Sequence, residues 1–210
     1  HVSTRRGVAM IREAKERGIR VTAEASPHHL TLTDDAVDAY RTDAKVNPPL
    51  RSEADRLAVI EGLRDGTLDI IATDHAPHTK EEKQQVYTKS PSGGPLVQHA
   101  LPAMLQLYHE KKISLEKIVE KMCHNPAILF QIEKRGFIKE GYKADLVLVD
   151  INAPWSVQPS NTAYKCGWSP FEGFTFKSRV THTFVNGNLV YKNFKFYPFQ
   201  EAERLTFDRK

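Results

Sequence analysis

The feature that most restricts the fold of this chain is an alternation of short apolar runs with amphipathic segments over residues 1–73. Residues 1–3 are typical of a strand end, 5–17 of a helix, 19–25 of a strand, 52–63 of a helix and 70–73 of a buried strand. Parallel strands connected by crossover helices have this order. The pattern therefore predicts an α/β fold in which the carboxyl ends of the strands lie on one face.

Candidate metal ligands gather at these predicted strand ends. The cluster Asp74-His75-Ala76-Pro77-His78 directly follows the 70–73 run, and Pro27-His28-His29 follows the 19–25 strand. Divalent metals are bound by histidine and carboxylate groups that different strands bring together. Each group alone has a structural alternative, such as a hydrogen-bonded histidine, an outward-facing strand residue or a loop cap. Three successive strand ends with such groups favour a site, with these candidates: His1, Glu24, His28, His29, Asp74 and His78.

Further helices and a long loop are expected up to about residue 133. Residues 81–95 are polar and rich in Lys, Ser and Gly, which predicts a long mobile loop bordering the substrate entrance. Residues 96–111 predict a helix with Pro102 in its first turns, because an interior proline breaks a helix. Ser114 is expected to cap the next helix.

The tail of the chain has a different pattern. Residues 144–150 predict a strand, and 179–185 and 189–196 predict two strands joined by Asn186-Gly187, a strong hairpin signal. Residues 163–174 fit neither strand nor helix. We therefore expect a division into 1–133, with the strand-end residues, and a β-rich, sandwich-like domain over 134–210.

Composition excludes several function classes. The chain has 210 residues, 40% hydrophobic and 27% charged, and its net charge of +4 is scattered, which argues against a nucleic-acid interface. Cys123 and Cys166 form no CxxC pair, so neither disulfides nor a thiolate zinc site is expected. No apolar run approaches the ~18 residues that span a membrane, and no signal peptide is visible. We expect a cytoplasmic protein, and the start at His1 rather than Met predicts the C-terminal part of a longer chain.

Eight motifs, in order along the chain, closely resemble the C-terminal half of the dihydroorotase family, in the amidohydrolase superfamily of metal-dependent, distorted (β/α)8 barrels. The pair PHHL and TDHAPH together with NPPLR is the most specific part, whereas the ADLVLVD strand occurs in many amidohydrolases. The motifs are HVST at 1–4, VTAEASPHHL at 21–30, KVNPPLR at 45–51, ATDHAPHTKEEK at 72–83, SGGP at 92–95, HNPA at 124–127, ADLVLVD at 144–150 and GWSPFEG at 167–173.

The resemblance implies specific roles. His1 and Asp74 match zinc ligands at the ends of the sixth and eighth barrel strands, and Asp74 also matches the acid/base that moves a proton to the leaving nitrogen. Asn47 and His78 match substrate-contacting positions, with His78 placed to meet a substrate carboxylate. The backbone of Ser92 and Gly93 matches a further substrate contact. His75 receives no role.

The same resemblance implies the reaction and its partners. It is the zinc-dependent, reversible hydrolysis of (S)-dihydroorotate to N-carbamoyl-L-aspartate in pyrimidine synthesis, with two zinc ions in a complete site. The other ligands and the substrate arginine match positions upstream of His1, so we expect the chain to need that N-terminal half and to be inactive alone. Self-association stays open.

Two departures and two alternatives accompany this reading. Many relatives have Phe-Gly and then Glu-Thr where this chain has Ser92-Gly93 and Gln98-His99. A contact made by the backbone tolerates the first change. The sequence does not explain the effect of the second change. A hydantoinase, dihydropyrimidinase or allantoinase shares the barrel and Asp74, but their pattern lacks a histidine at the position of His78. A non-catalytic scaffold for a partner enzyme is the other alternative, although it would usually have lost metal ligands such as His1 and Asp74.

Overall fold

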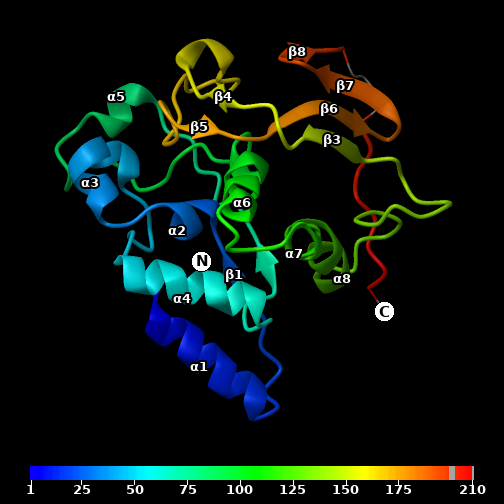
Figure 1. Ribbon diagram of the computed structural model, residues 1–210, viewed down its shortest axis with the longest axis horizontal. Coiled ribbons are helices and arrows are strands. Elements are labelled where there is room, and N and C mark those ends of the chain that lie inside the picture. Colours follow the sequence, from blue (N-terminus) through cyan, green and yellow to red (C-terminus); the bar gives the residue numbers. More distant parts are fainter. Residues whose placement is uncertain (199–201, 210) are drawn as a thin grey trace.

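Two parallel strands and the start of the chain lie side by side in the computed structural model, which describes residues 1–198 and 202–209 (Figure 1). Strand β1 (Glu24–Ala25) pairs in parallel with β2 (Ile70–Ile71). On the other side of β1, the Val2 amide donates to the Glu24 carbonyl at 2.9 Å. The predicted parallel α/β arrangement is therefore present, with β1 in the middle.

Both strands are shorter than the sequence predicts. The expected strand over 19–25 keeps ladder pairing only at Glu24–Ala25. One residue earlier, the Ala23 amide donates to the Asp69 carboxylate at 2.7 Å, and the Asp69 amide donates back to the Ala23 carbonyl at 2.8 Å. The Asp69 carboxylate thus takes the place of a backbone carbonyl as the partner of the Ala23 amide, so regular strand pairing begins only at Glu24.

The two long amphipathic helices form as predicted. Helix α1 (Arg5–Glu16) begins at Thr4, whose hydroxyl accepts from the Gly7 amide, and α4 (Glu53–Arg64) begins at Ser52, which caps the Asp55 amide. The two helices pack against each other beside β1 and β2 (Figure 1). Val8 and Gly62 form part of this contact, which fixes how closely the helices approach.

Short helices replace two segments that were expected to be irregular. Pro27, which follows the predicted strand, begins α2 (Pro27–Thr31), because proline suits the first turn of a helix. The predicted loop over 81–95 overlaps α5 (Lys80–Lys83), a turn that Thr79 and Glu82 close as a capping box. The loop therefore starts after residue 83, and its mobility stays a prediction. The remaining short elements before α4 are α3 (Asp35–Tyr40) and the 3₁₀ turn η1 (Arg41–Ala44).

The helices after this loop follow the predicted order. Helix α6 (Ala100–His109) starts four residues later than expected and holds Pro102 in its first turn. Ser114 caps α7 (Leu115–Val119), which continues as the π-helical segment η2 (Glu120–His124) and α8 (Asn125–Leu129).

The tail forms two antiparallel sheets. Four strands pair in the order β3 (Leu146–Asp150), β6 (Arg179–Val185), β7 (Asn188–Lys192) and β8 (Lys195–Phe196). Asn186 and Gly187 have φ of 49° and 84°, the positive pair that a two-residue hairpin turn requires. A second pair of positive φ values, at Asn193 and Phe194, divides the expected strand 189–196 into β7 and β8.

The second sheet and the segment around it pack onto the first part of the chain. Strands β4 (Trp155–Ser156) and β5 (Thr175–Phe176) pair, with the 3₁₀ turn η3 (Pro159–Asn161) following β4. Phe171 and Phe176 are buried in the same core as Leu63 and Met104. This core includes residues from both 1–133 and 134–210. The division between these two ranges stays a prediction. No helix within the described residues is long and apolar enough to cross a membrane.

Candidate metal and substrate site

His1, the first residue, and Asp74, which follows β2, face each other. The His1 Nε2 atom lies 3.2 Å from Asp74 Oδ1, and both side chains are about three-quarters buried. Asp74 has a positive φ of 50°, which turns the chain sharply at the end of β2. Burial raises the pKa of the Asp74 carboxyl above its usual value, while the nearby His29 lowers it in part. The structure thus brings together the two predicted ligands.

Glu24 holds the other side of the His1 ring. Its Oε1 atom lies 2.6 Å from His1 Nδ1, and the Ser26 hydroxyl lies 3.2 Å from the same nitrogen. A proton on Nδ1 that is donated to Glu24 leaves the Nε2 lone pair directed at Asp74. Metal-binding histidines are oriented by a carboxylate in this way. Glu24, a candidate ligand in the sequence, therefore lies behind His1 rather than beside Asp74.

This pair suits a metal ion in donor type and spacing. A neutral Nε2 and a carboxylate both offer lone pairs, so a cation between them would relieve their repulsion. Two atoms bound to one tetrahedral zinc at about 2.0–2.2 Å lie roughly 3.3–3.6 Å apart, slightly farther than the observed 3.2 Å. Within the described ranges, however, no three His, Cys, Asp or Glu side chains gather as a metal site. His1 and Asp74 thus fit as part of a ligand set.

His28 and His29 are buried, and His29 lies near enough to Asp74 to lower the pKa of that carboxyl. They come from α2, with rings 4.1 Å apart, and His29 Nε2 donates to the Pro48 carbonyl at 2.9 Å. Both nitrogens of His28 and the Nδ1 of His29 have no hydrogen-bond partner in the part of the chain that the structure describes. Burial, then the neighbouring His29, lowers the pKa of His28 to about 3, so its ring is neutral at pH 7. The hydrogen bond from His29 to Pro48 holds the backbone next to Asn47. Asn47 itself is exposed.

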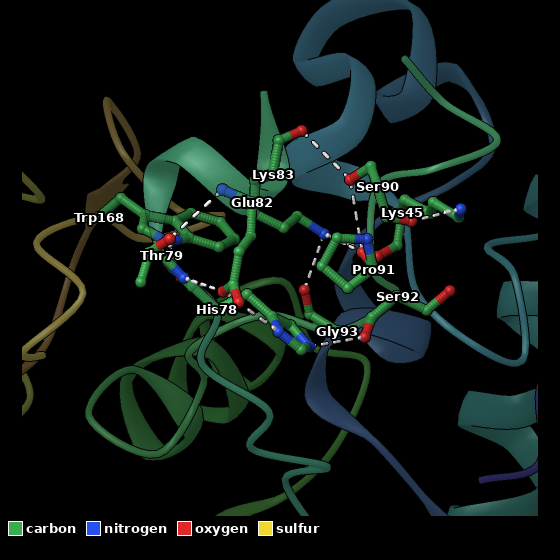
Figure 2. A network of polar contacts seen from close by, with 10 residues as sticks. All are labelled: Lys45, His78, Thr79, Glu82, Lys83, Ser90, Pro91, Ser92, Gly93 and Trp168. Carbon is green, nitrogen blue, oxygen red and sulfur yellow. Dashed lines mark hydrogen bonds and ion pairs between the residues drawn. The ribbon is translucent and has the colours of Figure 1, made fainter. Parts of the chain in front are cut away.

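The predicted substrate residues on the loop lie together. His78 Nε2 donates to the Ser92 carbonyl at 3.1 Å, and its Nδ1 lies 3.7 Å from the Glu82 carboxylate (Figure 2). The Gly93 amide donates to the Lys45 carbonyl at 2.9 Å, two residues before Asn47. Next to them, the Ala76 amide donates to the Gly94 carbonyl at 3.1 Å, so the segment between Asp74 and His78 runs alongside the loop.

Gly93 can only be a glycine in this arrangement. Its φ of 121° is rarely adopted by other residues, and a Cβ there would lie 2.6 Å from Ala76 Cβ and 3.5 Å from His78 Nε2. The close approach of the two segments therefore depends on this residue.

Several residues that support the site had no assigned role in the sequence. His75 Nδ1 accepts from the Leu96 amide at 3.0 Å, which ties the end of the loop to the cluster after β2. Trp168 is buried, and its Nε1 donates to the His78 carbonyl at 2.8 Å (Figure 2). The tryptophan lies in the segment 163–174 that could not be assigned, so only the GWSPFEG motif pointed to it.

The departure at Gln98-His99 has a structural explanation. The Gln98 amide donates to the Tyr164 hydroxyl at 2.8 Å, and its side-chain oxygen accepts from the Ala163 amide at 2.8 Å. His99 is fully buried, and its Nδ1 lies 2.9 Å from the Ser169 hydroxyl. The two residues attach the segment that carries Trp168 to the start of α6. Their role is in packing. Their partners lie about 65–70 residues away in the sequence.

His1 and Asp74, which can both donate to a metal ion, meet beside a pair of parallel strands and place this chain in a class of α/β proteins with a site at the strand ends. A model described as "Amidohydrolase family" matches residues 2–190. The chain belongs to the amidohydrolase family.

Curated relatives and solved structures give narrower similarities. The chain is 46% identical over 191 residues to a dihydroorotase of Acetivibrio thermocellus and 45% identical over 192 residues to one of Clostridioides difficile, covering 90% and 91% of this chain and 45% of each relative. It therefore spans about half the length of these relatives. It also matches the structure of an L-hydantoinase (dihydropyrimidinase) from Arthrobacter aurescens, with a TM-score of 0.88, 30% identity, and coverage of 94% of this chain and 45% of that one.

Proposed function

We propose that this chain is part of a dihydroorotase, which interconverts (S)-dihydroorotate and N-carbamoyl-L-aspartate in pyrimidine synthesis. The observation that carries the proposal is the placement of His78 against Ser92 and Gly93, on the segment that follows Asp74. The relatives at 45–46% identity are named dihydroorotases, which supports the same reading.

The substrate side of the proposal concerns the ring carboxylate. An imidazole N–H and nearby backbone groups are suitable donors for a carboxylate. His78 would exchange its Ser92 carbonyl partner for the substrate carboxylate and donate to it through Nε2. Asn47 and the backbone of Ser92 and Gly93 would contact the rest of the ring.

The metal side of the proposal rests on His1 and Asp74, which would hold zinc together with ligands from the part of the relatives that this chain does not match. Zinc, when bound, lowers the pKa of a water ligand toward about 7 and polarises the amide carbonyl. Asp74 would take the proton of the attacking water and pass it to the leaving nitrogen. Glu24 would keep His1 oriented throughout.

We extend the proposal to the domains, the metal content and the cellular compartment of the protein. Residues 1–133 would form the C-terminal part of a (β/α)8 barrel and 134–210 a sandwich-type domain. The complete site would contain two zinc ions, the partner would be a small molecule, and the compartment would be the cytoplasm. The chain alone would be inactive without the other half of the site.

A hydantoinase or dihydropyrimidinase is the second candidate, because the matched structures are of hydantoinases and a dihydropyrimidinase, with TM-scores of 0.81–0.88. These reactions also open a cyclic amide, but their unsubstituted ring substrates lack the carboxylate that His78 would bind. The position of His78 beside Ser92 therefore favours dihydroorotate.

The test is a comparison of substrates with the full-length protein that contains this chain. Turnover of dihydroorotate that exceeds turnover of unsubstituted hydantoin, and that is lost with a chelator and restored by zinc, is the expected result. Faster hydrolysis of hydantoin would establish the second candidate. No turnover and no bound zinc by elemental analysis would leave a non-catalytic scaffold.

A further inference from the structure

Lys83 is a fully buried lysine that neither the metal site nor the substrate contacts account for. It is the last residue of α5, five positions after His78, and its side chain has no exposed surface. Burying an ammonium group is unfavourable unless its donors are satisfied. The partners of Lys83 therefore indicate what it does.

All three donors of the ammonium meet backbone carbonyls. Lys83 Nζ donates to Gly93 at 2.9 Å, to Pro91 at 3.0 Å and to Lys45 at 3.2 Å (Figure 2). An ammonium group has three N–H donors, so each one is used. In return, the Ser90 hydroxyl donates to the Lys83 carbonyl at 3.1 Å, so both the side chain and the backbone of Lys83 are tied to this loop.

These carbonyls belong to two of the three segments that carry the proposed substrate contacts. Lys45 precedes Asn47 by two residues, and Pro91 and Gly93 flank Ser92. Lys83 is covalently attached to the third segment, which contains His78. One ammonium group thus connects every segment of the proposed substrate site, and the Gly93 amide bond to the Lys45 carbonyl completes the arrangement.

Lys83 is mostly in its ammonium form near neutral pH, although burial disfavours the charge. Burial lowers its pKa to about 8; Asp43 opposes this shift, and the nearby Lys45 and Lys80 reinforce it. With a pKa near 8, about nine in ten molecules carry the ammonium form at pH 7. The Trp168 ring, whose centroid lies 5.7 Å from Nζ, adds a favourable contact with the cation.

We propose that Lys83 is a positioning residue, which sets the spacing of Asn47, His78 and the Ser92–Gly93 backbone so that they bind the substrate together. This inference rests on the proposed function, because it concerns the same substrate contacts. Lys83 does not touch the His1–Asp74 pair in this arrangement. Its loss should therefore weaken substrate binding and leave the proton transfer at Asp74 largely intact.

The experiment is steady-state kinetics of the full-length protein with Lys83→Met, which keeps the length of the side chain and removes its donors. We expect KM for dihydroorotate to rise on the order of 10- to 100-fold, since small misplacements of binding groups have effects of this size. We expect kcat within about 3-fold of wild type and an unchanged zinc content. Lys80→Met is the matched control, because Lys80 lies in the same helical turn but donates to the Asp43 carboxylate and not to the loop carbonyls.

A purely structural role would give a different result. A lowered melting temperature with an unchanged KM, measured where the variant is fully folded, would overturn the proposal. If Lys83→Met does not fold, Lys83→Arg decides: a planar guanidinium cannot reach three carbonyls arranged around one ammonium, so KM should rise, and an unchanged KM would overturn the proposal.

The failure of the proposed function can be told apart from the failure of this inference. Wild-type turnover of dihydroorotate against hydantoin decides the function. The ratio of variant to wild-type KM, on whichever cyclic amide is hydrolysed, decides the role of Lys83. Without turnover, the dissociation constant of N-carbamoyl-L-aspartate replaces KM, and an equal value for Lys83→Met and wild type would count against positioning.

Discussion

Glu24 Oε1 lies 2.6 Å from His1 Nδ1, on the side of the ring opposite to Asp74. A proton on Nδ1 that is donated to this carboxylate fixes both the tautomer and the orientation of the imidazole. The β1 ladder holds Glu24 in turn, because its carbonyl accepts from the Val2 amide in the same strand end as His1. The position of the proposed metal ligand is therefore set by its neighbour in the sheet.

We predict that Glu24→Ala weakens zinc binding about 10- to 100-fold, because the loss of a carboxylate behind a ligating histidine has effects of this size. Glu24→Gln should lose less, since its amide oxygen can still accept the Nδ1 proton. Competition with a zinc-selective chelator measures the affinity. Glu61→Gln is the control, because Glu61 only pairs with Arg64 on the surface of α4. Equal affinities for wild type and Glu24→Ala would contradict the role of Glu24.

His78 should distinguish substrates by their charge. We predict that His78→Ala lowers kcat/KM for dihydroorotate about 10- to 100-fold, since a hydrogen bond to a charged group contributes about 1.5–3 kcal/mol. Activity on unsubstituted hydantoin should change less than about 3-fold. His182→Ala, on β6, is the control. An equal loss on both substrates would contradict the recognition of a carboxylate by His78.

Periodicity and capping residues were sufficient to predict the main elements of the fold. The apolar spacing of α1 and α4, their caps Thr4 and Ser52, and the Asn186-Gly187 turn act within a few residues, so local rules apply to them. The length of β1 could not be predicted, because a carboxylate distant in the sequence, Asp69, ends the ladder at Ala23.

The candidate site was predictable in part for the same reason. His1 and Asp74 follow from their places at strand ends, and the family motifs carry His78 and Gly93. The orientation of Glu24 and the burial of Lys83 depend on contacts across 23 and 38 residues. In the sequence, Lys83 is one charged residue among several in a polar stretch, and nothing local indicates that it points inward.

Gly93 should be intolerant of a side chain for two separable reasons. We predict that Gly93→Ala destabilises the fold by about 1–3 kcal/mol and raises KM, because φ of 121° is unfavourable for alanine and the new Cβ would meet Ala76. Gly141→Ala tests the conformational part alone, since Gly141 has φ of 77° with nothing within 4 Å. Urea unfolding and kinetics measure the two effects. A KM for Gly93→Ala equal to that of Gly141→Ala would contradict the close approach.

His99 should make the stability of the fold depend on pH. Burial lowers its pKa to about 4 from 6.5. Between these two values the ring is mostly neutral in the folded chain and mostly protonated in the unfolded chain. The unfolded chain therefore binds more protons between pH 4 and 6.5, and the free energy of unfolding falls as the pH falls through this range. The contribution is complete above pH 6.5, and about 2–3 kcal/mol of it should be lost by pH 4.5.

Urea unfolding of wild type and His99→Leu at pH 7, 5.5 and 4.5 measures this contribution. The variant loses the Ser169 hydrogen bond and is less stable at pH 7, but its stability should fall less steeply with acid. Carboxylates such as Asp74 titrate in both proteins, so the difference between the two curves isolates His99. Parallel curves would mean that the ring takes up its proton without cost in the folded state, contrary to its burial against Trp155, Phe171 and Phe176.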